Sequence, residues 1–311
     1  MSKFERPRIF RPPSEWMSYY LPLTSGCSNN TCMFCYYYGS KLQMRDIDEV
    51  KAEIDALKLF KTQRLAVPGM SPVVYQLASQ WDGRRVFLQD GDALVYPFAK
   101  LIEVLDYLND RFPELERIAV YATAQDILLR SVDELRQLEE RKLSILYVGL
   151  ESGEDDILKA VGKNSTVADM IAAARKVKEA GVALSVMVIL GLGGVELSER
   201  HALATAKVLS EMDPEFGAAL TLTVVPGTPL HHLIEAGEFK PISPFQSLQE
   251  LRTIIANLEL THCFFSSMHA SNYLTVRGTL PEDKTRMLAQ IDKVLEKRDP
   301  SMLRPEGFRS L

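Results

Sequence analysis

The sequence lacks a long apolar run, an apolar leader at its N-terminus and a surplus of basic residues. Its longest apolar stretch, residues 182–192 with Ser185 and Gly191 inside it, falls short of the ~18 residues that a membrane-spanning helix needs. Residues 1–13 contain no apolar core of the kind that a signal peptide carries. We therefore expect a soluble, cytoplasmic protein without a membrane partner.

Charge and composition exclude further classes of protein. The chain has 36 basic and 41 acidic residues, a net charge of −5, whereas a protein that coats nucleic acid usually carries a basic surplus. Hydrophobic residues make up 46% of the chain and charged residues 25%, close to the globular average, which excludes disorder for most of the chain. We expect a globular protein, and a nucleic-acid partner is disfavoured.

Cysteine is scarce, and its placement is uneven. Three of the four cysteines, Cys27, Cys32 and Cys35, fall within nine residues, while Cys263 stands far away. Disulfides among the three would close short, strained loops, and a cytosolic chain of this size does not need them. Clustered thiols in a reducing compartment indicate metal ligands.

From residue 17 onward, β-rich runs alternate with helical periodicity. The β-rich runs cover residues 17–23, 85–89, 118–122, 144–150, 183–190 and 218–225. The helical patterns cover residues 47–59, 97–112, 132–141, 166–180 and 197–212. The alternation predicts an α/β fold with a parallel sheet and right-handed crossovers. Six such units fit a partial, partly open (β/α)6 TIM-like barrel. A doubly wound open sheet is the alternative, because sequence alone does not show whether the sheet closes.

The chain is expected to have three parts. These are an N-terminal arm at residues 1–16, the partial barrel at residues 17–230 and a C-terminal α/β extension at residues 231–311 that covers the barrel. The extension contains helical patterns near residues 248–258 and 282–297. The arm is rich in Arg and Pro, and we expect it to be solvated. In a barrel and in an open sheet alike, ligands bind at the carboxyl ends of the strands.

The three clustered cysteines have the spacing C-x4-C-x2-C and follow the first predicted strand. Three thiolates on a short loop can hold three irons of a [4Fe–4S] cluster and leave the fourth iron open, whereas zinc sites normally use four N or S ligands. No fourth Cys or His is nearby in the sequence, although Cys263, His262 and His269 could approach in space. The alternatives are a structural zinc site and three unligated thiols.

The loop resembles the cluster-binding loop of the radical S-adenosylmethionine (SAM) superfamily, whose usual spacing is C-x3-C-x2-C. An aromatic residue commonly precedes the third cysteine in that family, and Phe34 stands there. This sequence departs from the pattern by one extra residue in the first gap. The resemblance implies that Cys27, Cys32 and Cys35 hold a [4Fe–4S] cluster and that Phe34 lies at the site of SAM, the second cofactor.

The segment Asp90-Gly91-Asp92, after the second predicted strand, looks like the family's Gly-Gly-Glu segment. That segment binds the ammonium group of SAM, and backbone carbonyls with a carboxylate suit such a cation. Aspartates replace the first glycine and the glutamate here. The alternative is an ordinary Asp-Gly turn, because these residues dominate turns.

Two later strand ends are also similar to the family's SAM-binding segments. Glu151 and Ser152 match the region that binds the ribose and carboxylate of SAM. Glu151 also ends an apolar run, where a buried charge without a partner would be energetically costly. The alternative is a solvated loop acid. Lys163 is expected to be solvated rather than to reach the SAM carboxylate. The residues that match the family's adenine contacts are Ile189, Gly191 and Val225, the last ending the sixth predicted strand.

The resemblance implies a radical SAM enzyme that cleaves SAM reductively to a 5′-deoxyadenosyl radical, which abstracts hydrogen from an unidentified small-molecule substrate. A flavodoxin or ferredoxin would donate the electron. The chain resembles relatives of the oxygen-independent coproporphyrinogen oxidases, but tyrosines at residues 36–38 replace a further cysteine, so the porphyrin substrate is not implied. Residues 262–278 either line the substrate mouth or form a capping strand. The alternatives are a non-catalytic zinc metalloprotein and an RNA-modifying member of the same superfamily.

Overall fold

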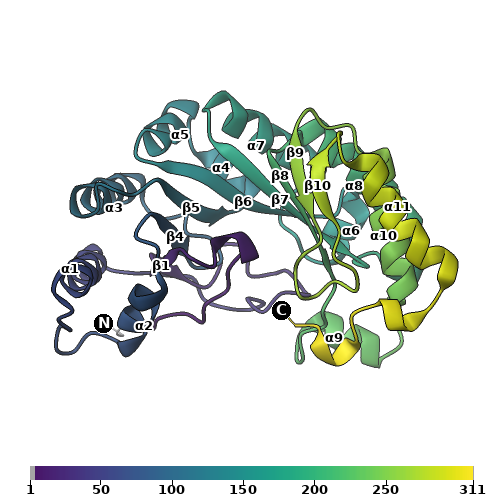
Figure 1. The fold of residues 1–311 in the computed structure, drawn as a ribbon, viewed down its shortest axis with the longest axis horizontal. Helices are drawn as coiled ribbons and strands as arrows, with labels where there is room; N and C mark the ends of the chain where they lie inside the picture. The colour runs from purple at the N-terminus through teal and green to yellow at the C-terminus, as the bar shows by residue number, and fades with distance from the viewer. Residues whose placement is uncertain (1–3, 311) are drawn as a thin grey trace. The chain divides into compact units, whose positions relative to one another are not determined.

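The computed structural model describes residues 4–310 and has the predicted α/β class, with a mostly parallel sheet in the order β1-β4-β5-β6-β7-β8-β9-β10 (Figure 1). The strands are β1 (Tyr19–Pro22), β4 (Arg85–Gln89), β5 (Arg117–Ala122), β6 (Leu143–Glu151), β7 (Ala183–Leu190), β8 (Phe216–Thr221), β9 (Cys263–Ser266) and β10 (Arg277–Leu280). A short antiparallel pair joins β2 (Thr24–Ser25) and β3 (Gln43–Met44).

Helices separate most of the strands. They are α1 (Ile47–Gln63), α2 (Pro72–Gln80), α3 (Phe98–Arg111), α4 (Ala124–Leu129), α5 (Val132–Glu139), α6 (Asp155–Ala160), α7 (Val167–Glu179), α8 (Gly194–Met212), α9 (Pro229–Glu235), α10 (Pro244–Asn257) and α11 (Lys284–Lys297). Within the described residues 4–310, no helix is both long and apolar enough to cross a membrane.

The chain divides into two compact units. The first contains residues 4–30, 39–147 and 176–182, and the second contains residues 31–38, 148–175 and 183–310. These interleaved units do not follow the three parts expected from the sequence, and the boundaries of those parts stay a prediction.

In the first unit, β4 pairs in parallel with β1 and with β5. Helix α1 packs against α2 and α3 (Figure 1). Val50, Ile54 and Leu57 are buried on α1, at the spacing that places side chains on one face of a helix. Asp46 begins this helix by accepting a hydrogen bond from the backbone N–H of Asp48.

In the second unit, β8 pairs in parallel with β7 and β9, and β10 adds an antiparallel edge strand. Helix α10 packs against both α8 and α11 (Figure 1). The tail therefore extends the sheet beyond β8. The prediction that the sixth strand continues to Val225 was wrong. The carbonyl of Val225 accepts hydrogen bonds from the backbone N–H and the hydroxyl of Thr228, which places it in the turn before α9.

The N-terminal arm is solvated only in part, because a buried acid binds it through Arg6. Arg6 donates hydrogen bonds to Glu53, whose carboxylate is 1% exposed, and to the carbonyl of Tyr20. Arg45 and the hydroxyl of Tyr19 also contact this carboxylate. A charge removed from water needs such partners, so Arg6 anchors the arm to the first unit, while most of the arm's other residues stay exposed or half-buried.

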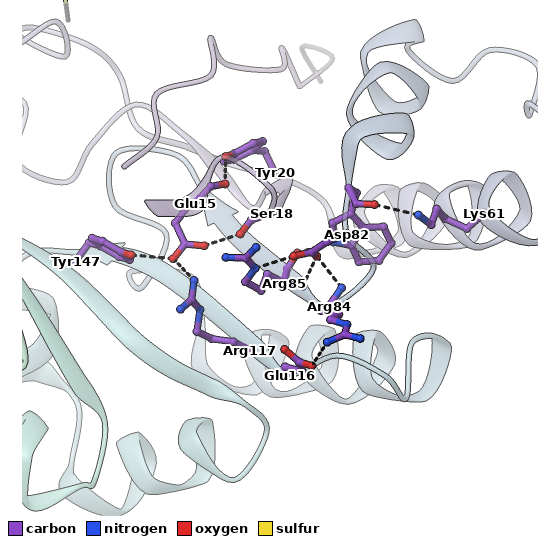
Figure 2. Close-up of polar contacts among 11 residues, drawn as sticks. Glu15, Ser18, Tyr20, Lys61, Asp82, Arg84, Arg85, Glu116, Arg117 and Tyr147 are labelled. Atoms are coloured by element: carbon purple, nitrogen blue, oxygen red, sulfur yellow. Dashed lines mark hydrogen bonds and ion pairs between the residues drawn. The ribbon is translucent and has the colours of Figure 1, made fainter. Parts of the chain in front are cut away.

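A second buried acid fixes the end of the arm (Figure 2). Glu15 is fully buried and accepts hydrogen bonds from Ser18, from Arg117 at 2.6 Å and from the hydroxyl of Tyr147 at 2.8 Å. Arg117 begins β5 and Tyr147 lies within β6. One carboxylate therefore joins the arm to two strands.

We expect Glu15→Gln to lower the free energy of unfolding by about 2 kcal/mol, because it removes a charge-assisted hydrogen bond in a buried position. Chemical denaturation measures the change. The control is Glu116→Gln, which breaks the exposed ion pair with Arg84 in the same region (Figure 2). Exposed pairs contribute about 0–1 kcal/mol. Equal losses in the two variants would contradict the structural role of Glu15.

Candidate active site

None of the four cysteines forms a disulfide. Cys27 belongs to the first unit and is half-buried, with its Sγ 3.8 Å from the carbonyl oxygen of Gly91. Cys32 and Cys35 belong to the second unit, where Cys32 is buried and Cys35 half-buried. Each unit thus carries part of the predicted ligand set.

In the first unit, the segment after β1 is bonded to the segment after β4. The backbone N–H of Gly26 donates to the Asp90 carboxylate at 3.1 Å, and the N–H of Asp90 donates to the hydroxyl of Thr24 at 3.2 Å. The hydroxyl of Thr24 donates in turn to the carbonyl of Asp92 at 3.3 Å. Sequence reasoning assigned Cys27 and residues 90–92 to one site, and the structure places them side by side.

Asp92 forms a carboxyl pair with Asp126, a residue that sequence reasoning missed. Both are buried, and the hydroxyl of Ser28, next to Cys27, contacts both carboxyl groups. Burial raises the pKa of Asp92 well above its usual range, and the neighbouring Asp126 raises it further. Asp126 follows β5 within the first turn of α4, a strand-end acid whose sequence context, Thr-Ala-Gln-Asp, resembles an ordinary helix start.

In the second unit, the turn that contains Cys32 and Cys35 is bonded to the end of α6. The N–H of Met33 donates to the carbonyl of Val161 at 2.8 Å, and the hydroxyl of Thr31 donates to the carbonyl of Gly162 at 2.7 Å. Burial raises the pKa of the Cys32 thiol to about 11, while the nearby Lys163 ammonium acts in the opposite direction.

Helix α6 ends in a Schellman motif that places Lys163. The N–H of Gly162 bonds to the carbonyl of Lys159, and the N–H of Lys163 bonds to that of Leu158. Gly162 has φ +72°. A Cβ there would clash with the carbonyl oxygen of Thr31, so this position needs glycine for space as well as for conformation.

β6 ends at Glu151, as the apolar run predicted, and Glu151 is not a solvated acid. Its carboxylate is 13% exposed and lies 3.1 Å from the ammonium of Lys163, which is 9% exposed. The expectation that Lys163 is solvated was therefore wrong, because the buried acid attracts it. Glu151 has φ +64°, a conformation that side chains rarely adopt and that recurs at functional sites. Its carboxylate folds back over Gly149, where a Cβ would clash with it.

Phe34 and Ile189, predicted to lie at the SAM site, share one apolar cluster. They are partly buried against Ile157, Val161 and Leu192. An aromatic ring and an aliphatic side chain from the cysteine turn and from β7 thus form one continuous apolar surface in the second unit.

The other residues predicted to contact SAM in the second unit are Ser152, Gly191 and Val225. Ser152 is fully buried, and its hydroxyl bonds to Nδ1 of His201. Gly191 follows β7, and its N–H donates to Glu250 at 2.7 Å. Val225 is half-buried in the turn before α9. His201 and Glu250 were missed, because a lone buried residue on an amphipathic helix has no distinguishing motif.

The residues considered as a fourth zinc ligand have other neighbours. Cys263 is buried in β9, where burial raises its pKa to about 12. His262 is exposed, with its Nδ1 3.6 Å from Glu282. His269 shares a hydrogen bond with the hydroxyl of Ser271. The donor set on the cysteine loop is therefore three thiols, which suits an iron–sulfur cluster better than a four-ligand zinc site.

Comparison with known proteins gives the chain a family context. The family described as the radical SAM superfamily matches residues 21–206. The heme chaperone HemW of Bacillus subtilis (strain 168) is 23% identical over 233 residues, which is 73% of this chain and 56% of the relative. A tRNA-2-methylthio-N(6)-dimethylallyladenosine synthase of Pseudomonas aeruginosa (strain UCBPP-PA14) is 26% identical over 320 residues, 97% of this chain and 60% of the relative. The chain thus spans little more than half the length of these relatives.

Solved structures agree on the fold. Coproporphyrinogen III oxidase (HemN) from Escherichia coli, a radical SAM enzyme, matches with a TM-score of 0.53 and 17% identity, over 77% of this chain and 51% of that one. The protein anSMEcpe, solved with bound AdoMet and a peptide, also matches with a TM-score of 0.53, at 14% identity, over 76% of this chain and 58% of that one. At these identities the likeness concerns the fold alone.

Proposed function

This chain belongs to the radical SAM superfamily, and on that premise we propose that it is an enzyme that binds a [4Fe–4S] cluster through Cys27, Cys32 and Cys35. The observation that carries the proposal is the attachment of the Cys32–Cys35 turn to the end of α6, beside the Glu151–Lys163 pair. When bound, the cluster would supply the electron for reductive cleavage of SAM. A small electron-carrier protein such as a flavodoxin or ferredoxin would provide that electron.

The chain's own residues would hold SAM at the strand ends. Glu151 would accept a hydrogen bond from a ribose hydroxyl, and Lys163, already beside it, would balance the charge of the SAM carboxylate. Asp90, Gly91 and Asp92 would bind the ammonium group through backbone carbonyls and carboxyl oxygens. These roles follow from the chemistry of each group and from the family's motif order.

Apolar side chains would receive the adenine. Phe34 and Ile189 form one surface in the second unit, and Gly191 and Val225 follow the neighbouring strands β7 and β8. Burial of an aromatic base against such a surface excludes water, and it contributes to the binding free energy in proportion to the apolar area that is covered.

Anaerobic reconstitution with iron and sulfide tests the proposal. We expect about four irons per chain, the visible absorbance of an iron–sulfur cluster, and release of 5′-deoxyadenosine when SAM and a strong reductant are added. A chain that takes up one zinc instead, or a reconstituted chain that cleaves no SAM, would overturn the proposal.

The substrate we propose is a small molecule, and RNA is the second candidate. The similarity to tRNA-2-methylthio-N(6)-dimethylallyladenosine synthases favours RNA, while the net charge of −5 disfavours it. A gel-shift assay with tRNA decides between them, because RNA binding through phosphates weakens steeply with salt. A salt-sensitive shift at low protein concentration would support RNA, and its absence would support a small molecule.

We expect Glu151→Gln to reduce SAM affinity about tenfold or more, while iron content and fold are retained. The change is nearly isosteric, so no cavity arises, but a charge-assisted hydrogen bond of about 1.5–3 kcal/mol is lost. Anaerobic calorimetry measures the affinity. The control is Glu154→Gln, a nearby acid that pairs with Arg200 on an exposed face. Unchanged SAM affinity in Glu151→Gln would show that Glu151 does not contact SAM, and loss of iron would show that its role is structural.

A further inference from the structure

His201 connects two strand ends from a fully buried position in the second unit. It lies on α8 and is 0% exposed. Its Nδ1 lies 2.8 Å from the hydroxyl of Ser152, the residue after β6, and its Nε2 lies 3.1 Å from the carbonyl oxygen of Ile189 in β7. Ser152 follows Glu151 directly, and Ile189 belongs to the apolar surface formed with Phe34.

The partners determine how the ring carries its proton. A carbonyl oxygen only accepts, so Nε2 must donate to Ile189, and Nδ1 must accept from the hydroxyl of Ser152. Burial lowers the pKa of His201 to about 4, which keeps the ring neutral at pH 7. The oxygen of Ser152 also accepts from the N–H of Glu154 at 3.1 Å. Both hydrogen-bonding functions of the Ser152 hydroxyl are therefore used inside the protein.

Glu250 extends the same connection from α10. One carboxyl oxygen accepts from the N–H of Gly191 at 2.7 Å, and the other accepts from the hydroxyl of Ser198 at 2.6 Å. The first oxygen lies 3.8 Å from Nε2 of His201. Two helices thus hold the end of β7: α8 bonds to Ile189, and α10 bonds to Gly191, which follows the strand. Helix α8 also holds the end of β6 through Ser152.

We propose that His201 and Glu250 are positioning residues that hold the ends of β6 and β7 in the arrangement that binds SAM. The inference rests on the proposed function, because it assigns Glu151, Ile189 and Gly191 to the SAM site. Neither His201 nor Glu250 touches the cofactor; each acts through the backbone or side chain that it fixes. Ser152 belongs with them, because its hydroxyl is already used.

Two substitutions of His201 separate its two bonds. Asparagine places an acceptor near the position of Nδ1, so His201→Asn keeps the bond to Ser152 and loses that to Ile189. Glutamine places a donor near the position of Nε2, so His201→Gln keeps the bond to Ile189 and loses that to Ser152. We expect each variant to bind SAM about three- to tenfold more weakly, the cost of one neutral hydrogen bond. Amide hydrogen exchange should rise near residues 189–192 in the first and near 151–154 in the second.

The control is Val208→Ala, which removes buried apolar atoms two turns further along α8. It should lower the melting temperature without changing SAM affinity or the local exchange pattern. Wild-type chain that holds iron but does not bind SAM by calorimetry would overturn the proposed function itself. If the wild type binds SAM and both His201 variants bind it with the wild-type affinity, only the positioning role would be overturned. A uniform rise in exchange, the same in all three variants, would also overturn it.

Discussion

Cys32→Ala should lose all bound iron and all cleavage of SAM while the chain stays folded. Cys32 is one of three proposed ligands, and two thiolates do not hold a [4Fe–4S] cluster whose fourth iron must stay open. The substitution removes one buried sulfur atom from a side chain that is 6% exposed, so the cost to the fold is small. Iron and sulfide content after anaerobic reconstitution measures the effect, with circular dichroism as the check on the fold.

The matched control is Cys263→Ala, which removes the same atom from a fully buried cysteine in β9. That variant should retain iron and SAM cleavage, since β9 carries none of the proposed ligands. Iron retained in Cys32→Ala, or lost in Cys263→Ala, would show that the ligand assignment is wrong. The comparison also excludes a general effect of removing a buried thiol.

Regular elements were predictable where local pattern and tertiary packing agree. β4 and β7 have the predicted bounds, because both contain the apolar run that is typical of a strand buried in a parallel sheet. The short helices α2, α4 and α6 were missed, since segments of six to nine residues show little of a helical period.

The candidate site was predictable only at the strand ends. The cysteines are recognisable by their close spacing after the first strand. Glu151 is recognisable because it is a charged residue at the end of an apolar run. Asp126, His201 and Glu250 act through partners distant in sequence, and no local pattern marks a residue whose importance lies in a long-range hydrogen bond. The same applies to Lys163, whose ion pair arises from the end of α6 meeting the end of β6.

The end of α6 leads to the second large effect, Gly162→Ala. A residue with Cβ in the left-handed conformation costs about 1–2 kcal/mol, and the clash with the carbonyl of Thr31 adds about 1–3 kcal/mol unless the cysteine turn moves. Movement of that turn displaces Cys32 from its position beside Lys163. We therefore expect a lower free energy of unfolding and, after reconstitution, a lower ratio of iron to protein.

Gly181→Ala separates these two costs. Gly181 ends α7 in the same Schellman motif, with φ +79°, but no atom lies within 4 Å of the position that its Cβ would take. The Gly181→Ala variant should lose only the conformational cost, about 1–2 kcal/mol in the free energy of unfolding, and should keep its full iron content. Denaturation and iron analysis of the two variants side by side measure the difference. Equal iron in both would mean that the bond between the cysteine turn and the end of α6 does not control the cluster, whereas iron lost only in Gly162→Ala assigns the positioning of Cys32 to the end of α6.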